Sequence, residues 1–551
     1  MNRQRLFLPV LLALFAAACG GDSGDAGGAE GANVPEAERY GGTAVVGAIG
    51  DIPDINPLTS TDHTANQVQQ FVLFTPLVRY DGDFEPQPYG AESWELNADT
   101  TAVTFHLRDD LFWHDGVKTT AYDWKFSYDL ARDPNTAFPN TAFWTHYGEA
   151  EAVDSFTFRV RMRPHADFLD PWRSFAPVPK HVLEGVPAAE LKNHPFSTSQ
   201  PLGNGPFRFV SRQQGQRWTF EANPQYPPEL GGRPYLDRLV YRSIPEPTTL
   251  LTELLTGNID YYIAPPPEQA EQIQASNAAR LVTFPDRSFV IIGWNERLPK
   301  FKDPRVRRAL TMAIDRQAIV DGVLYGHGSV ANSTVPPFFW QYDEQAGQGL
   351  AYDLARARQL LAEAGWRDRD GDGLIENQQG EPFRFVMLTN QGNQARQDII
   401  QVVQADLRKV GIQVQPQVLE WGSLLERIND PERLDFEALV VGWVTEFRID
   451  DSDLFSCDKL DDPYQWVSYC DPQTDRLLDT LPMIVDREAA RPLWQQYQRK
   501  IAQDQPYTFL YFQERLEGVS NRLHNVDPDA RGDWVGVKDW YILPSARRAG
   551  A

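Results

Sequence analysis

Strand and helix patterns alternate along most of this chain, most clearly between residues 395 and 442. Residues 399–410 carry an apolar stripe at helical spacing that ends at Gly411. Residues 412–418 then alternate as a strand, and residues 436–443 form a nearly continuous apolar run. A run of this kind is typical of a strand that is covered on both faces. The sequence therefore predicts an α/β fold with largely covered sheets.

The length and charge of the chain narrow the architecture and the partners. Its 551 residues exceed what one hydrophobic core holds, since cores split beyond about 250–300 residues, so we predict two lobes. The formal net charge of -24 argues against a nucleic-acid partner, because binding to phosphates needs Lys and Arg. No apolar run after residue 19 approaches the ~20 residues that cross a bilayer.

The N-terminus predicts where the protein resides. Arg3 and Arg5 precede an apolar stretch, and three alanines then precede Cys19. We interpret residues 1–18 as a signal peptide and Cys19 as a site of acylation; the alternative is an ordinary signal peptide with a coincidental cysteine. Residues 19–40 are rich in Gly, Ala and acids and predict a flexible tether. The expected location is the periplasm or cell envelope, with the lipid as the membrane anchor.

The two remaining cysteines, Cys457 and Cys470, lie close together far downstream. A disulfide between them is expected in an exported chain, because the compartment outside the cytoplasm is oxidising. The alternative is a pair of free buried thiols.

Motifs for catalysis or cofactor binding were not found, so we expect a protein that is not an enzyme and holds no cofactor. One metal motif is weak: Asp368, Asp370 and Asp372 match the start of a calcium loop, but Gln379 stands where that loop needs Glu. The alternative interpretation is a Gly/Asp turn between a helix and a hairpin.

Several sequence stretches, in this order, resemble family 5 of the extracellular solute-binding proteins, the peptide, nickel and oligosaccharide receptors of bacterial ABC importers. They are "TFHLRDDLFWHDG" at 104–116, "GNGPF" at 203–207, "KDPRVRRALTMAIDRQAIVDGVLYGHG" at 302–328, "YDLARARQLLAEAGW" at 352–366, "QADLRKVGIQVQPQVLEW" at 404–421 and "YCDPQTDRLLD" at 469–479. Each stretch is a weak signal alone, whereas the ordered set is specific.

The resemblance implies a large, type II periplasmic-binding-protein fold, with two α/β lobes around a cleft that closes by a hinge. The first lobe would take residues 41–290, with an extra domain at about 82–200, and would receive the returning segment 509–551. The second lobe would take residues 291–508.

The resemblance also implies a function. The chain would be a monomeric substrate-binding component that captures peptides and delivers them to permease subunits with their ATPases. An oligosaccharide or metal-chelate receptor is the alternative within the family, and an extracytoplasmic hydrolase or chaperone is the alternative outside it.

The family also suggests ligand-binding residues. An Asp that holds the ligand ammonium in dipeptide receptors aligns with Glu446, and Asp450 falls in the acidic turn that follows. The arginine that clamps the ligand carboxylate aligns with Asn390, a departure that favours longer peptides.

Trp421 and Trp443 follow predicted buried strands, where α/β sheets present ligand sites, although core packing is an equal alternative. The pair Cys457 and Cys470 matches a disulfide-bearing loop of the same branch.

Overall fold

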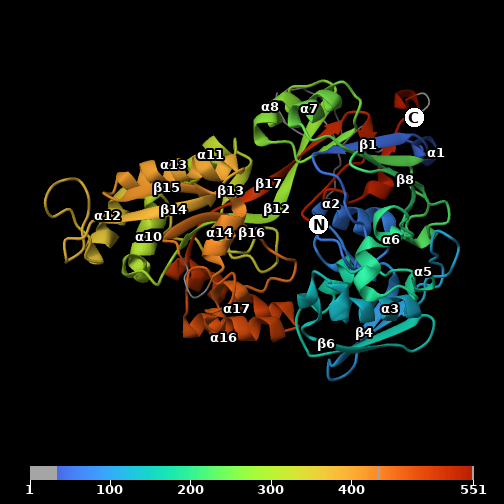
Figure 1. The fold of residues 1–551 in the computed structure, drawn as a ribbon, viewed down its shortest axis with the longest axis horizontal. Helices are drawn as coiled ribbons and strands as arrows, with labels where there is room; N and C mark the ends of the chain where they lie inside the picture. The colour runs from blue at the N-terminus through green and yellow to red at the C-terminus, as the bar shows by residue number, and fades with distance from the viewer. Residues whose placement is uncertain (1–33, 431–434, 549–551) are drawn as a thin grey trace, which may run out of the picture.

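The computed structural model describes residues 34–430 and 435–548, which form two lobes joined by long strands (Figure 1). Among these residues, one 11-stranded sheet runs through both lobes in the order β15-β14-β16-β12-β17-β11-β1-β10-β9-β8, with β13 paired to β17 off this path. Cys19 and the predicted signal peptide lie outside the described residues. No helix in the described part of the chain is both long and apolar enough to traverse a bilayer.

Two strands cross from one lobe to the other: β12 (Ala279–Trp294) and β17 (Tyr507–Ser520). They pair in an antiparallel manner along most of their length, from Ala279 opposite Ser520 to Gly293 opposite Tyr507. The register shifts between Pro285 and Phe289, where the strands pass between the lobes. The lobe boundary therefore falls inside these strands, which also contain residues 290 and 509, where the sequence analysis divided the lobes.

The first lobe is built around β1 (Thr43–Ala48), which lies between two parallel partners. Helices α7 and α8 cover one face of the sheet with a small apolar cluster around Leu250 and Ile259, and a larger cluster fills the other face. The other strands and main helices of this lobe are β8 (Phe207–Gln213), β9 (Arg217–Ala222), β10 (Arg238–Ser243), β11 (Tyr261–Ile263), α2 (His63–Val68), the π-helix η1 (Gln69–Leu73), α7 (Pro247–Leu255) and α8 (Ala270–Gln274).

One glycine-containing stretch brings two backbones of this lobe together. The amide of Gly205 donates to the Leu73 carbonyl at 2.8 Å, and a Cβ at Gly203 would lie 1.9 Å from the same oxygen. Only glycine fits at such a distance, which explains the "GNGPF" sequence at 203–207.

An antiparallel sheet with the order β4-β5-β7-β6 forms a separate unit below the first lobe in Figure 1. The buried ring of Trp172 packs against neighbours such as Phe105, Tyr128 and Trp144 in its core. Its elements are β4 (Ala91–Leu96), β5 (Ala102–Leu107), β6 (Tyr147–Ala152), β7 (Thr157–Met162), α3 (Ala121–Arg132), α4 (Asp170–Ser174), α5 (Lys180–Leu183) and α6 (Pro195–Thr198). Its elements lie within residues 82–200, the range that the resemblance assigns to an extra domain, and we call this unit the extra domain below.

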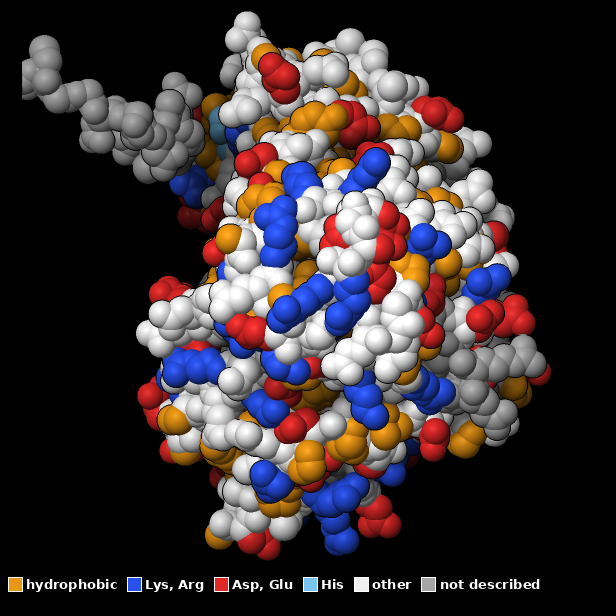
Figure 2. Space-filling view, turned by 90° about the vertical axis from the view of Figure 1, so that its left-hand side faces the viewer, with side chains coloured by type: hydrophobic (Ala, Val, Ile, Leu, Met, Phe, Trp, Pro, Cys, Tyr) orange, Lys and Arg blue, Asp and Glu red, His pale blue; other side chains and the backbone are white. Residues whose placement is uncertain are grey.

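The second lobe packs helices on both faces of its part of the sheet, so β16 is an apolar run as predicted. Asp303, Asp315 and Asp353 accept hydrogen bonds from the first turns of α10, α11 and α12, as expected of N-caps. The elements are β13 (Gly328–Val330), β14 (Arg384–Asn390), β15 (Gln413–Leu419), β16 (Ala438–Val444), α9 (Pro299–Lys302), α10 (Pro304–Ala313), α11 (Arg316–Val323), α12 (Leu354–Glu363), α13 (Gln394–Arg408), α14 (Trp421–Ile428), α15 (Ser452–Phe455), α16 (Pro472–Thr480) and α17 (Arg487–Asp504). On the face shown in Figure 2, basic side chains lie among acidic ones.

The end of the predicted tether is part of the folded body. Residues Glu36–Arg39 form the short helix α1, and the ring of Tyr40 packs edge-on against Tyr235 at 5.0 Å. The Arg39 guanidinium lies over the rings of Tyr235 and Tyr541. The prediction of a tether as far as residue 40 is therefore wrong for this last turn, because its aromatic and basic side chains find partners on the first lobe.

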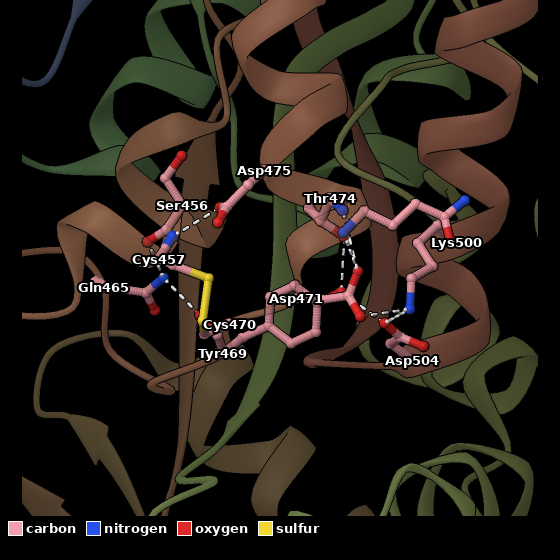
Figure 3. The surroundings of a disulfide bond; sticks show 11 residues. Ser456, Cys457, Gln465, Tyr469, Cys470, Asp471, Thr474, Asp475, Lys500 and Asp504 are labelled. Atoms are coloured by element: carbon pink, nitrogen blue, oxygen red, sulfur yellow. Dashed lines mark hydrogen bonds and ion pairs between the residues drawn. A yellow bond between two sulfur atoms is a disulfide. The ribbon is translucent and has the colours of Figure 1, made fainter.

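Cys457 and Cys470 form a disulfide in the second lobe (Figure 3). The Gln465 amide crosses the closed loop and donates to the carbonyls of Ser456 at 3.2 Å and Tyr469 at 3.1 Å. Closing a loop of this size stabilises the fold by about 3 kcal/mol in the chain-entropy model. The loop packs beside α16 and α17, where the Lys500 ammonium pairs with Asp471 and Asp504 (Figure 3).

Candidate ligand-binding cleft

A β-hairpin of the first lobe reaches across to the second lobe. Its strands are β2 (Val78–Tyr80) and β3 (Pro86–Pro88), and Asp81 closes its turn by accepting hydrogen bonds from the amides of Asp83 and Glu85. Phe84 sits in this turn with a left-handed φ of 59°, a strained conformation for a bulky residue. Its ring packs against Phe338, Phe339 and Phe447 of the second lobe at 5.3, 5.8 and 5.5 Å.

Phe447 lies at the centre of the contact between the lobes. The guanidinium of Arg173, from the extra domain, lies 4.1 Å from the centre of the Phe447 ring, and that of Arg287, from β12, lies 4.5 Å from it. The ring of Tyr80 also packs against Phe447, with 5.7 Å between the ring centres. Desolvated cation–π contacts of this kind contribute about 1–2 kcal/mol each.

Two polar contacts also join the lobes. The Ala166 amide of the extra domain donates to the Pro482 carbonyl of the second lobe at 2.6 Å. Glu85 of the hairpin pairs with Arg487 at the start of α17. The structure is therefore a closed form, in which both sides of the cleft touch.

A cavity of about 220 Å³ lies between these contacts. Its walls come from the hairpin and residues 165–169 on one side, and from residues 448–449 and 481–494 on the other. Aromatic side chains line it through Tyr80, Trp340 and Trp494. A mostly apolar, aromatic wall with a few charged groups is characteristic of small-molecule sites.

Ionisable side chains within this cavity have shifted pKa values. Burial and the nearby Asp170 raise the pKa of Asp167 to about 6. Burial, with Arg448 as a lesser cause, lowers the pKa of His165 to about 3, and the Nε2 atom of this buried histidine has no hydrogen-bond partner in the described structure. Shifts of this kind gather where proteins bind ligands, although ion-pair networks produce them as well.

The predicted residues Glu446 and Trp443 lie at the edge of the cleft and do not line the cavity. Glu446 follows the end of β16; its side chain is 66% exposed, and its carboxylate lies 3.4 Å from the Arg287 guanidinium. The Trp443 ring packs edge-on against Tyr464 and Trp466, which places it in the partly buried packing that was the alternative interpretation.

Asn390 and Trp421 lie at the same sheet edge but further from the hinge, because β14 and β15 lie beyond β16 in the strand order. The Asn390 side chain accepts a hydrogen bond from Arg396 at 2.9 Å, and Trp421 is 45% exposed as the first residue of α14. Asp450 pairs with Arg448 and accepts from the Ser452 amide. The cavity is lined by none of these three predicted residues, Asn390, Trp421 and Asp450.

Sequence reasoning missed Asp167, Phe447 and Arg448, which the structure brings into or beside the cavity. Phe447 and Arg448 lie between the predicted residues Glu446 and Asp450, so the sequence analysis identified the right segment but not these two positions. Asp167 gives no sequence signal, because its position depends on how the extra domain packs against the second lobe.

The calcium-like loop brings its acidic groups together. Carboxylate oxygens of Asp368, Asp370, Asp372 and Glu376 lie within 4.8 Å of one another. Glu376, which the sequence motif did not include, is buried and accepts from the Arg369 amide. Four carboxylate ligands suit a hard cation such as calcium. The side chains of Asp368 and Asp372 also accept hydrogen bonds from backbone amides, as expected for the alternative interpretation, a Gly/Asp turn.

The fold and the cleft can now be compared with known proteins. The family model for bacterial extracellular solute-binding proteins, family 5 Middle, matches residues 85–459, which is more than half of the chain. The chain belongs to this family. The oligopeptide-binding protein AppA of Bacillus subtilis is a family relative with 34% identity, covering 98% of this chain and 100% of that protein. The dipeptide-binding protein of Escherichia coli is 25% identical over 88% of this chain and 92% of its own length.

Solved structures give the same family fold. The structure of AppA of Bacillus subtilis in complex with a nonapeptide matches with a TM-score of 0.74 and 33% identity, covering 92% of this chain and 99% of that one. NikZ of Campylobacter jejuni in complex with Ni(L-His) matches with a TM-score of 0.73 at 23% identity, covering 91% and 99%. The predicted family and its two-lobed fold are confirmed.

Proposed function

We propose that this solute-binding protein captures peptides between its lobes and delivers them to the permease of an ABC importer. The observation that carries the proposal is the similarity, over nearly its whole length, to a protein named as an oligopeptide-binding protein. The cavity agrees with this ligand class, because a peptide offers apolar side chains for the aromatic wall and charged groups for Asp167 and Arg448.

Binding requires the lobes to separate first, since Phe84 and the Glu85–Arg487 pair close the cleft. The two crossing strands β12 and β17 supply the hinge, and the separate cores on either side let each lobe move as a unit. When the lobes close again over a peptide, the cation–π contacts around Phe447 re-form beside it.

We infer that Glu446 holds the ligand ammonium at the edge of the cleft. Its carboxylate is exposed and 3.4 Å from Arg287, so the existing pair is weak and leaves oxygen lone pairs for an incoming amine. A charge-assisted hydrogen bond to an ammonium contributes about 1.5–3 kcal/mol.

The test is calorimetric titration of residues 34–551 with peptides of two to nine residues. We expect the affinity for peptides to fall about tenfold or more when the peptide amine is acetylated, and to fall by a similar factor in Glu446→Gln. Both changes remove the same charge pair. Glu426→Gln, at an exposed position on α14, is the matched control and should bind as the wild type does. Binding of oligosaccharides or metal chelates in place of peptides would overturn the proposal.

We further propose that acylated Cys19 anchors the protein to the membrane. The alanines before Cys19 and the charged start of the chain support this. Membrane fractionation of cells that express Cys19→Ala should show the protein released from the membrane fraction. A variant that stays in the membrane fraction like the wild type would contradict the anchor.

A further inference from the structure

A second pocket lies entirely on the first-lobe side of the cleft. Its cavity of about 130 Å³ is bounded by η1, β2 and the short helix η9 (Val537–Asp539), with one side chain from α4 of the extra domain. No residue of the second lobe lines it. It is therefore separate from the cavity between the lobes, although Tyr80 borders both.

The charged residues that line this pocket are mostly cationic, in a chain whose net charge is negative. Four cationic residues line it, namely Arg79, Arg173, Arg531 and Lys538, against one acid, Asp539. The whole chain has 76 acidic and 52 basic residues, so a local excess of positive charge is not a consequence of composition. A concave site that gathers one sign of charge attracts ligands of the other sign.

The arginines differ in how far they are already paired. Arg531 is bound to Asp529 and to the Tyr80 carbonyl, and Arg173 lies 3.2 Å from Asp170. Arg79, by contrast, makes no ion pair within the described residues; it is exposed and its guanidinium lies 5.2 Å from the centre of the Tyr89 ring. The Arg79 guanidinium therefore remains free to bind a carboxylate, with which it can form two parallel hydrogen bonds.

The rest of the pocket is apolar. Phe71, Val78, Leu230, Val535 and Val537 line it beside the cationic groups. An inorganic anion would leave these side chains without a contact, whereas an acid that carries a branched aliphatic group would cover them and reach the guanidinium groups at once.

We propose that this first-lobe pocket binds a carboxylate attached to a small apolar group. The carboxylate pairs with Arg79 at the rim, and the apolar group packs against the valines and Phe71. Two sources share this chemistry: the C-terminal end of the imported peptide, and a free small organic acid. The pocket uses no residue to which we assign the ligand ammonium.

The probe is 4-methylpentanoate, titrated into the protein and compared with its neutral amide. We expect the acid to bind at least tenfold more tightly than the amide, and to weaken as salt rises. Arg79→Gln should reduce the affinity for the acid about tenfold. Gln70→Glu, which places a carboxylate at the pocket wall with little change in size, should reduce it as well. Arg161→Gln, at an exposed position on β7, should leave it unchanged.

Equal binding of acid and amide would overturn the proposal, as would an affinity that neither Arg79→Gln nor Gln70→Glu alters.

A competition experiment identifies the source of the carboxylate. If 4-methylpentanoate displaces a peptide with a free C-terminus but not its C-terminal amide, the carboxylate belongs to the imported peptide; if it displaces neither, the ligand is a free acid. Since the acid is titrated alone, failure of peptide binding and failure of this pocket are observed separately.

Discussion

At the scale of single residues, the cleft contains groups that a fold selected for stability alone would not contain. The cavity between the lobes holds Asp167, whose carboxyl has a raised pKa because it is partly buried near Asp170. It also holds His165 with an unpartnered nitrogen. Ligand sites commonly retain such groups at a cost to stability.

The cost at Asp167 can be measured. Its pKa rises from 3.8 to about 6 on folding, so the protonated carboxyl favours the folded state below pH 4, and this contribution is lost as the pH rises through 6. Two pKa units correspond to about 3 kcal/mol at most. We expect Asp167→Asn to raise the melting temperature at pH 8 and to leave it nearly unchanged at pH 4.

The control for this experiment is Asp461→Asn, which makes the same substitution at an exposed position of the second lobe. Thermal unfolding of the wild type and both variants at the two pH values checks the prediction. A gain for Asp167→Asn of the same size at pH 4 and pH 8 would contradict the pKa shift as its cause.

At the scale of elements, the short hairpin β2–β3 carries a contact between the two lobes. Its two strands form a sheet of their own within the described residues, yet its tip packs into the aromatic cluster of the opposite lobe. Backbone strain at a bulky residue persists where surrounding contacts or function require it, and the ring of Phe84 is what this turn presents to the second lobe. The hairpin therefore acts as a contact that favours the closed form.

Removing the Phe84 ring should shift the protein toward an open form. A half-buried aromatic contact of this kind contributes about 1.5 kcal/mol, so Phe84→Ala should lower the closed-to-open ratio about tenfold. Small-angle scattering should then give a larger radius of gyration than the wild type.

Tyr325→Ala is the matched control, because Tyr325 is also an aromatic residue with a left-handed φ, of 55°, but is 61% exposed. It should scatter as the wild type does. Scattering by Phe84→Ala that is indistinguishable from this control would show that the hairpin does not hold the lobes together.

Elements were more predictable than sites. The caps Asp303, Asp315 and Asp353 and the buried strand β16 could be read from the sequence, because capping and strand burial depend on neighbours within a few residues. For the cleft, the sequence indicated the segment that contains Glu446. It did not indicate the groups that line the cavity, because these meet only when the two lobes pack together. Trp421 shows the limit: it follows a strand as predicted, yet that strand stands at the far edge of the sheet from the hinge.

At the scale of the whole molecule, one continuous sheet joins two separate cores. The sheet passes from one lobe to the other in β12 and β17, whose register shifts where the lobes join. Family resemblance predicted two lobes and a hinge, but the exact crossing could not be read from sequence, because each strand is apolar on both sides of it. The same arrangement lets the lobes separate without breaking either core.

The strand order has a consequence for how the chain is completed. Strand β11 ends at residue 263, but its antiparallel partner β17 begins only at residue 507, after the whole second lobe has been made. A chain that emerges from its N-terminus thus presents β11 as an open sheet edge throughout that interval, a template on which another chain can pair. Strand β17 closes this edge, so we expect a truncated product that lacks β17 to aggregate rather than to form a smaller working receptor.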